Sequence, residues 1–345
     1  MYHIQVKTRT WRGNLLLACS LAVVFTLGSI LQYTQAQPLI WVGTLLILFA
    51  CVFVFSGMIL LAARRAGRAR VPLTIALVVI DVIACVSVSI SICADGELFY
   101  PNQNQGAYDT LVGNPIMEQV TAHHGRDTYT GWFVHNSDGK APLVISFGGN
   151  EECAASRIAG DEKSGRLSVY SGYNFMMLDY PGYGTSPGSP SQSSMFSMAE
   201  AAYDYAVTRP DVDTTRIVIE GYSMGTGMAT YLASQRDIAG LILIAPYDSG
   251  LSLYNSRLNI FHGPLRWLVG FRADSMAYAQ SVQVAPLIVT STADEVIGYT
   301  QSENLGRYFP KSPQLTVFPA IPHTQYLATP QVLDLIRAYL QQVNQ

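Results

Sequence analysis

The sequence Gly221-Tyr222-Ser223-Met224-Gly225 constrains this chain more than any other feature. It follows the apolar run 217–219 and precedes a helical pattern over 224–235. A Gly-x-Ser-x-Gly turn between a strand and a helix is typical of a nucleophile elbow, because its tight backbone needs small residues two positions from the serine. The pattern predicts that Ser223 is exposed above a sheet edge, with the Met224 amide at a helix N-terminus that favours an oxyanion. The alternative is an ordinary strand-to-helix turn.

Composition indicates that a second part of the chain lies in a lipid bilayer. The 345-residue chain has a mean hydropathy of +0.22 and only 13% charged residues. The segments 15–31, 39–62 and 73–94 contain a single charge, Asp81, and each is near the roughly 20 residues that a bilayer-spanning helix needs. We therefore predict a membrane domain, residues 1–94, with three transmembrane helices. Buried helices of a soluble protein are the alternative.

The basic residues predict the orientation of these spans. Three of them precede the first span and four lie between the second and third, whereas the loop 32–38 has no charge. The positive-inside rule puts the N-terminus in the cytoplasm and everything after Cys93 on the periplasmic or extracellular side. Residues 1–36 also fit a cleaved signal peptide. With a cleaved signal peptide, the part of the chain after residue 94 is extracytoplasmic as well.

Charge and cysteine content limit the partners of the remaining chain. Residues 95–345 carry 14 basic and 23 acidic residues, a net charge of −9, so we predict no nucleic-acid partner. Four of the five cysteines fall in the apolar segments and Cys153 stands apart, which excludes a disulfide framework. A pair between Cys93 and Cys153 stays open. Asp81 marks either a functional site in the membrane or a contact with polar groups of a neighbouring helix. We predict no metal and no cofactor.

Strand and helix patterns alternate from residue 116 onward, which predicts a mostly parallel eight-stranded sheet flanked by helices. The predicted strands are 117–122, 131–135, 143–147, 174–179, 216–220, 241–244, 287–290 and 314–318, and the predicted helices are 194–207, 224–235, 300–308 and 330–342. Residues 95–115, rich in Asn, Gln, Gly and Pro, predict a linker. The insertion at about 247–283 predicts a cap over the elbow.

A serine nucleophile needs a histidine base and an acid that orients the histidine. On this kind of fold the chain order is serine, acid, histidine. Asp294 follows the strand 287–290, and His323 follows the last strand and is the only histidine after His262. We predict Asp294 as the acid and His323 as the base, with Asp248 and Glu295 as rival acids.

The second oxyanion donor is expected in the turn after an early strand. Gly148-Gly149-Asn150 follows the strand 143–147 and leaves the backbone unobstructed. The sequence therefore predicts the amide of Asn150 as the partner of the Met224 amide. A plain glycine turn is the alternative.

In these motifs, the soluble part of the chain resembles the α/β-hydrolase superfamily. Within it, the resemblance is to the Bem46-like group, which includes ABHD13-type and ABHD17-type membrane-associated hydrolases. The blocks that carry the resemblance are 147–150, 178–186, 221–226 and 245–249, with Asp294 and His323. The resemblance implies a Ser223–His323–Asp294 hydrolase of esters or thioesters. Many relatives have His-Gly-Asn at the oxyanion turn, where this chain has Gly148.

The expected function is that of a membrane-anchored serine hydrolase that cleaves small-molecule or lipid esters through an acyl-enzyme. Two other functions stay open: a serine peptidase or acyltransferase on the same fold, and a non-catalytic membrane receptor or scaffold.

Overall fold

The computed structural model describes residues 98–345 and five separate earlier positions, which are Val52, Ile75, Val79, Ile83 and Ser87. The chain divides into two units, residues 1–94 and 95–345. Within the described residues, no helix combines the length and the apolar character needed to cross a bilayer. Apart from the five positions, the predicted spans 15–31, 39–62 and 73–94 lie outside the described residues, as do Asp81, Cys93 and the alternative signal peptide.

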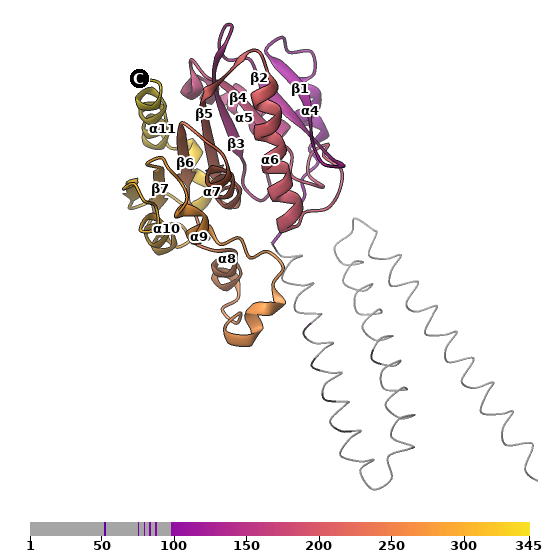
Figure 1. Cartoon of the computed structure of the whole chain (residues 1–345), viewed down its shortest axis with the longest axis vertical. Coiled ribbons are helices and arrows are strands. Elements are labelled where there is room, and N and C mark those ends of the chain that lie inside the picture. The colour runs from indigo at the N-terminus through magenta and orange to yellow at the C-terminus, as the bar shows by residue number, and fades with distance from the viewer. Residues whose placement is uncertain (1–51, 53–74, 76–78, 80–82, 84–86, 88–97) are drawn as a thin grey trace, which may run out of the picture. The chain divides into compact units, whose positions relative to one another are not determined.

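One eight-stranded sheet forms the centre of residues 98–345 (Figure 1). In chain order the strands are β1 (Met117–His124), β2 (Asp127–Val134), β3 (Ala141–Phe147), β4 (Asn174–Leu178), β5 (Val212–Tyr222), β6 (Gly240–Ile244), β7 (Leu287–Ser291) and β8 (Gln314–Phe318). Their order across the sheet is β1-β2-β4-β3-β5-β6-β7-β8. β2 pairs antiparallel with β1 and β4, and all other neighbouring strands pair parallel. The predicted strands and the mostly parallel sheet are confirmed.

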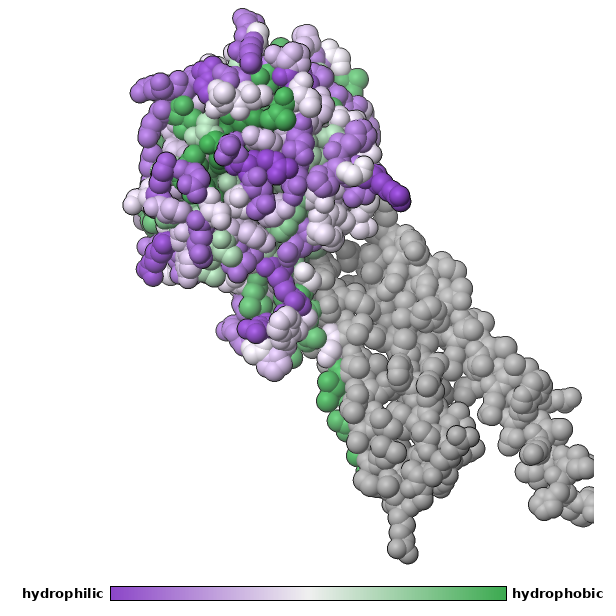
Figure 2. Space-filling model, in the orientation of Figure 1, coloured by the Kyte–Doolittle hydropathy of each residue, from purple (hydrophilic) through white to green (hydrophobic). Residues whose placement is uncertain are grey.

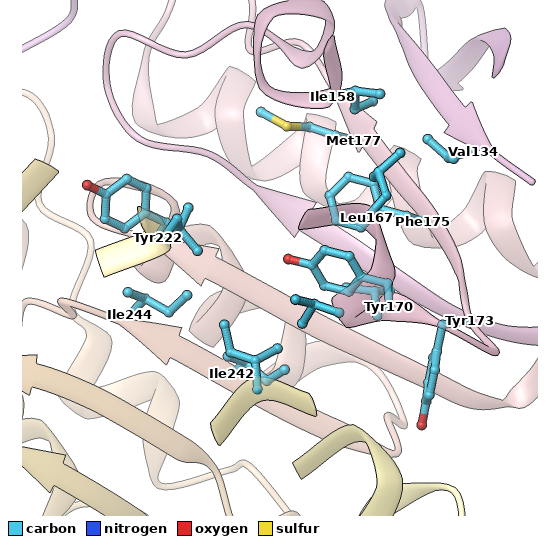
Figure 3. Close-up of a cluster of buried hydrophobic side chains, with 14 of the residues drawn as sticks. Val134, Ile158, Leu167, Tyr170, Tyr173, Phe175, Met177, Tyr222, Ile242 and Ile244 are labelled. Atoms are coloured by element: carbon cyan, nitrogen blue, oxygen red, sulfur yellow. The ribbon is translucent and has the colours of Figure 1, made fainter. Parts of the chain in front are cut away.

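Helices cover both faces of this sheet, so β3, β4, β6 and β7 are buried at every residue. On one face lie α6 (Gln192–Thr208) and α7 (Gly225–Gln235). On the other lie α4 (Gln105–Leu111), α5 (Ala154–Ser164), the 3-10 helix η2 (Arg166–Tyr170) and α11 (Pro330–Val343). Their side chains join those of the sheet in one apolar core, which includes Ile158, Phe175 and Ile242 (Figure 3). Tyr222 of the predicted elbow also belongs to this core.

The linker and the region after β3 differ from the sequence prediction. The described part of the predicted linker 95–115 packs on the domain, because it contains α4 and the fully buried Leu111. Helix α5 was not predicted, because its buried side includes the charged Arg157 and Asp161 instead of a purely apolar stripe. Cys153, which precedes α5, is buried and has no disulfide partner among the residues that the structure describes.

The insertion predicted at 247–283 contains α8 (Gly250–Arg257), the 3-10 helix η3 (Gly263–Leu268) and α9 (Ser275–Ala279). Figure 1 shows α8 and the orange segment after it projecting away from the sheet. The last two helical elements are α10 (Tyr299–Gly306) and the 3-10 helix η4 (His323–Ala328), which begins at the predicted base. Helices α6, α7, α10 and α11 match the four predicted helices.

Candidate active site

The predicted site residues lie at the carboxyl ends of four strands. The turn 148–150 follows β3, Ser223 follows β5, Asp294 follows β7 and His323 follows β8. Because β3, β5, β6, β7 and β8 are parallel neighbours, these ends meet at one edge of the sheet. Segments up to 175 residues apart in the sequence are thereby brought to one site.

The backbone at Ser223 has the strained geometry of an elbow. Its φ of 52° lies in the left-handed region that non-glycine residues seldom adopt. A Cβ atom on Gly225 would lie 2.0 Å from the carbonyl oxygen of Phe147, and one on Gly221 would lie 2.7 Å from the Cα of Thr226. Both glycines are therefore required because β3 and α7 approach the turn too closely for a side chain.

Ser223, His323 and Asp294 form a continuous hydrogen-bonded chain. The Oγ of Ser223 lies 2.8 Å from Nε2 of His323, and Nδ1 of His323 lies 2.8 Å from Oδ2 of Asp294. All three side chains belong to residues that are buried or nearly so. In this arrangement the imidazole can take the serine proton while the carboxylate holds its tautomer and orientation.

Asp294 is held in its ionised form by its surroundings. Burial opposes the charge, but the hydrogen bond and charge of His323 and the amides of Val296 and Ile297 outweigh it, so the pKa of Asp294 lies below its usual value. The hydroxyl of Tyr326 also donates to Oδ2 of Asp294 at 3.0 Å. Tyr326 was not predicted, because a tyrosine three residues after the base carries no sequence signal for such a role.

The two rival acids have other partners. Asp248 accepts hydrogen bonds from Asn304 and Ser249. Glu295 accepts from the backbone amide of His323, not from its ring. Among the residues that the structure describes, Asp294 is the carboxylate bonded to the imidazole.

Tyr222 ties the elbow to the histidine loop. Its hydroxyl donates to the carbonyl oxygen of His323 at 2.6 Å, and the two rings stack with centroids 5.7 Å apart. Because Tyr222 is also anchored in the apolar core, it fixes the distance between Ser223 and His323.

The predicted oxyanion turn is braced by side chains that the sequence did not single out. The Gly149 amide donates to Oε2 of Glu152 at 2.8 Å, and Tyr180 donates to the Gly148 carbonyl at 2.7 Å. Oδ1 of Asn150 accepts from the Tyr183 hydroxyl at 2.9 Å. Within residues 98–345, the amides of Asn150 and Met224 have no hydrogen-bond partner. Both predicted donors are therefore free for a ligand oxygen.

Met177 and Glu152 occupy the space that a side chain at position 148 would need. A Cβ on Gly148 would lie 2.6 Å from Cε of Met177 and 2.8 Å from Oε2 of Glu152. This chain therefore has a glycine at position 148 and a glutamate that binds the turn through the Gly149 amide. In the sequence, the only indication of this arrangement of Gly148 and Glu152 was the glycine at position 148.

We expect Glu152→Ala to lower kcat about tenfold, because the turn that carries the Asn150 amide loses its brace. Glu152→Gln should restore most of the activity, since an amide oxygen still accepts from the Gly149 amide. Steady-state kinetics on a soluble ester measures both variants. Equal losses in the two variants would contradict the brace.

A buried cluster of charged side chains lies beside the strand that leads to the elbow. Arg157 bonds Asp161 at 2.8 Å and Glu220 at 3.3 Å, and the Tyr170 hydroxyl donates to Glu220 at 2.8 Å. Burial raises the pKa of Glu220, and the Arg157 charge opposes this rise. Because Glu220 lies on β5 and Arg157 on α5, the cluster couples the strand before Ser223 to the helix after the oxyanion turn.

Asp179 organises the loop 179–186. Its carboxylate accepts from the amides of Ala154 and Thr185, and a Cβ on Gly184 would lie 2.1 Å from it. Burial raises the pKa of Asp179 to about 6, although both amides lower it. The ordinary pKa of 3.8 applies to the unfolded chain.

This shift predicts a pH-dependent stability. Between about pH 4 and pH 6 the folded state binds more protons than the unfolded state, so the free energy of unfolding falls as the pH rises, by about 3 kcal/mol in total. We expect Asp179→Asn to lack this slope, whatever its absolute stability. Urea unfolding of both proteins across this range measures it, and parallel curves would contradict the prediction.

Within the described residues, no group of three or more His, Cys, Asp or Glu side chains could hold a metal ion.

A mostly parallel sheet with a serine elbow, an acid and a histidine at successive strand ends defines the class of the α/β hydrolases. Comparison with known proteins agrees, since a sequence profile for the α/β hydrolase fold matches residues 158–329. The chain belongs to the α/β-hydrolase superfamily. The uncharacterized protein Rv2307c of Mycobacterium tuberculosis is 32% identical over 213 residues, which are 61% of this chain and 74% of the relative. The α/β hydrolase domain-containing protein aho-3 of Caenorhabditis elegans is 26% identical over 174 residues, which are 50% and 51% of the two chains.

Solved structures share the fold at low sequence identity. The esterase Pf2001 of Pyrococcus furiosus superposes with a TM-score of 0.55 at 16% identity, over 71% of this chain and 97% of the esterase. Est1E of Butyrivibrio proteoclasticus with bound ferulic acid gives a TM-score of 0.53 at 18% identity, over 65% and 98% of the two chains. At this identity the likeness establishes the fold alone.

Proposed function

We propose that this protein is a serine hydrolase of carboxylic esters or thioesters. The observation that carries the proposal is the hydrogen-bonded chain Ser223–His323–Asp294, which lies at the same sheet edge as the free amides of Met224 and Asn150. One structural neighbour, Pf2001, is named as an esterase, which favours ester chemistry over other reactions of the fold.

The reaction proceeds in two halves. Ser223 Oγ attacks the carbonyl carbon while His323 takes its proton, and the amides of Met224 and Asn150 bind the resulting oxyanion. The C–O or C–S bond then breaks, and His323 gives its proton to the leaving alcohol or thiol. In the second half His323 takes a proton from water, the hydroxide attacks the acyl-enzyme, and the acid leaves as Ser223 regains its proton.

The finer assignment is to the Bem46-like group of membrane-associated hydrolases. It is supported by the blocks 178–186 and 221–226 and by the similarity to aho-3. We further propose that residues 1–94 anchor the protein through three spans and that the hydrolase domain is extracytoplasmic. The uncharged segments and the flanking basic residues support this topology.

The substrate class is tested with the purified full chain and a series of esters, thioesters and amides of increasing acyl length. We expect hydrolysis of esters and thioesters and no cleavage of amides. Cleavage of peptides, or transfer of the acyl group to an added alcohol, would favour the peptidase or acyltransferase alternative. An absence of turnover, together with no labelling by a fluorophosphonate, would favour a non-catalytic receptor or scaffold.

A further inference from the structure

The insertion between β6 and β7 exposes large apolar side chains to solvent. Leu258 is 55% exposed, Leu265 42% and Trp267 63%. They flank or belong to η3, in the segment that projects from the body of the domain (Figure 1). Green hydrophobic residues are visible on the surface of this projection in Figure 2. We call these three residues the apolar tip.

The segment that carries the apolar tip has a positive charge in an otherwise acidic domain. Between Asp248 and Asp274 the chain has three arginines and no acidic residue, whereas residues 95–345 carry a net charge of −9. The guanidinium carbons of Arg266 and Arg272 lie 5.0 and 5.1 Å from the centroid of the Trp267 ring. Exposed Trp and Leu beside Arg are typical of segments that lie in the headgroup region of a bilayer.

Residues 99–100 connect this projection to the candidate site. Phe99 packs edge-on against Phe271 with ring centroids 5.8 Å apart. The amide of Tyr100 donates to Oδ1 of Asn150 at 3.1 Å. The base of the projection and the oxyanion turn are therefore both in contact with residues 99–100. Five peptide links separate Phe99 from Ala94, the end of the third predicted span, and an extended chain covers about 17 Å over that length.

We propose that the apolar tip inserts into the surface of a bilayer that contains anionic lipid, and that it holds the candidate site beside a source of acyl substrates. The tip supplies apolar area to the acyl region, and the arginines supply contacts to phosphate groups. This inference rests on the proposed membrane attachment and ester hydrolysis.

Tryptophan fluorescence tests the contact directly. The chain has four tryptophans. In a full-length background with Trp11→Phe and Trp41→Phe, only Trp267 and the buried Trp132 emit. After reconstitution into phosphatidylcholine vesicles containing phosphatidylglycerol, brominated acyl chains should quench part of the emission. Adding Trp267→Phe should abolish that quenching. If brominated lipid leaves the emission of Trp267 unchanged, the proposal is overturned. That result is also the one expected if the apolar tip binds a soluble protein instead of a bilayer.

Activity provides the second measurement and separates this inference from the proposed function. We expect Leu265→Gln with Trp267→Gln to lower hydrolysis of a long-chain ester in vesicles roughly tenfold. Hydrolysis of a short soluble ester should be unchanged. The control is Val112→Gln with Val207→Gln, which removes exposed apolar side chains from the residue after α4 and from α6.

The two failures have different signatures. A wild type that neither cleaves the short ester nor reacts with fluorophosphonate removes the proposed function. A wild type that does both, with equal vesicle activity in the tip variant and the control, removes the inference alone.

Discussion

Ser223→Ala is expected to abolish covalent labelling by a fluorophosphonate and to lower kcat for ester hydrolysis by about 10⁴-fold to 10⁶-fold. The hydroxyl removed is the one that lies 2.8 Å from the imidazole, and no other described residue takes its place there. Alanine has no atom that the elbow cannot accommodate, so the free energy of unfolding should change little. Probe labelling, steady-state kinetics and thermal unfolding of the purified full chain measure these effects.

A matched control comes from α6. Ser193 is exposed and distant in sequence from the elbow, and Ser193→Ala should leave labelling and kcat unchanged. Labelling that persists in Ser223→Ala would remove the assignment of the nucleophile. In right-side-out vesicles, labelling that requires permeabilisation would contradict the proposed topology.

Asp294→Asn is expected to lower kcat by about 10⁴-fold while the chain still folds. Oδ1 of Asp294 accepts from the amides of Val296 and Ile297, so the Asn oxygen is held at that position. The NH₂ group must then face Nδ1 of His323. It donates to Nδ1, the ring proton moves to Nε2, and the imidazole can no longer accept the proton of Ser223.

Asp248→Asn tests whether the effect depends on the identity of the carboxylate. Asp248 and Asp294 are equally buried, at 9% exposure, and both follow strands of the same sheet. Because Asp248 bonds Asn304 and Ser249, its replacement should change kcat only a few-fold. A large loss in Asp248→Asn with a small one in Asp294→Asn would exchange the roles of the two residues.

The site residues were predictable because each follows a strand that has a strong pattern of its own. The strands before Ser223 and Asp294 contain the short apolar runs 217–219 and 287–289, as expected for strands buried on both faces, and a parallel sheet brings such ends together. The glycine at 221 has a local cause, since the backbone of Thr226 excludes a side chain there, whereas Gly225 is required by the close approach of Phe147 on β3. The strand patterns and the spacing of the Gly-x-Ser-x-Gly motif are features that short stretches of sequence express.

The supporting residues were not predictable for the opposite reason. Tyr180 and Tyr326 each act through a partner 32 residues away, whereas Glu152 binds an amide three residues away within the same loop. Nothing in their own sequence neighbourhood distinguishes them from solvated or core residues. The same holds for α5, whose buried Arg157 breaks the apolar pattern because its charge is compensated by Asp161 and Glu220.

The sequence by itself determined the α/β class, the strand order along the chain, the elbow, and the acid and base that could serve it. Tertiary structure decided which carboxylate contacts the histidine, how the oxyanion turn is braced without a histidine at position 148, and that residues 98–111 belong to the domain. The physical reason is that hydrophobic periodicity and backbone sterics are local properties. Hydrogen bonds and buried charge pairs depend on distances that exist only after the strands and helices have packed.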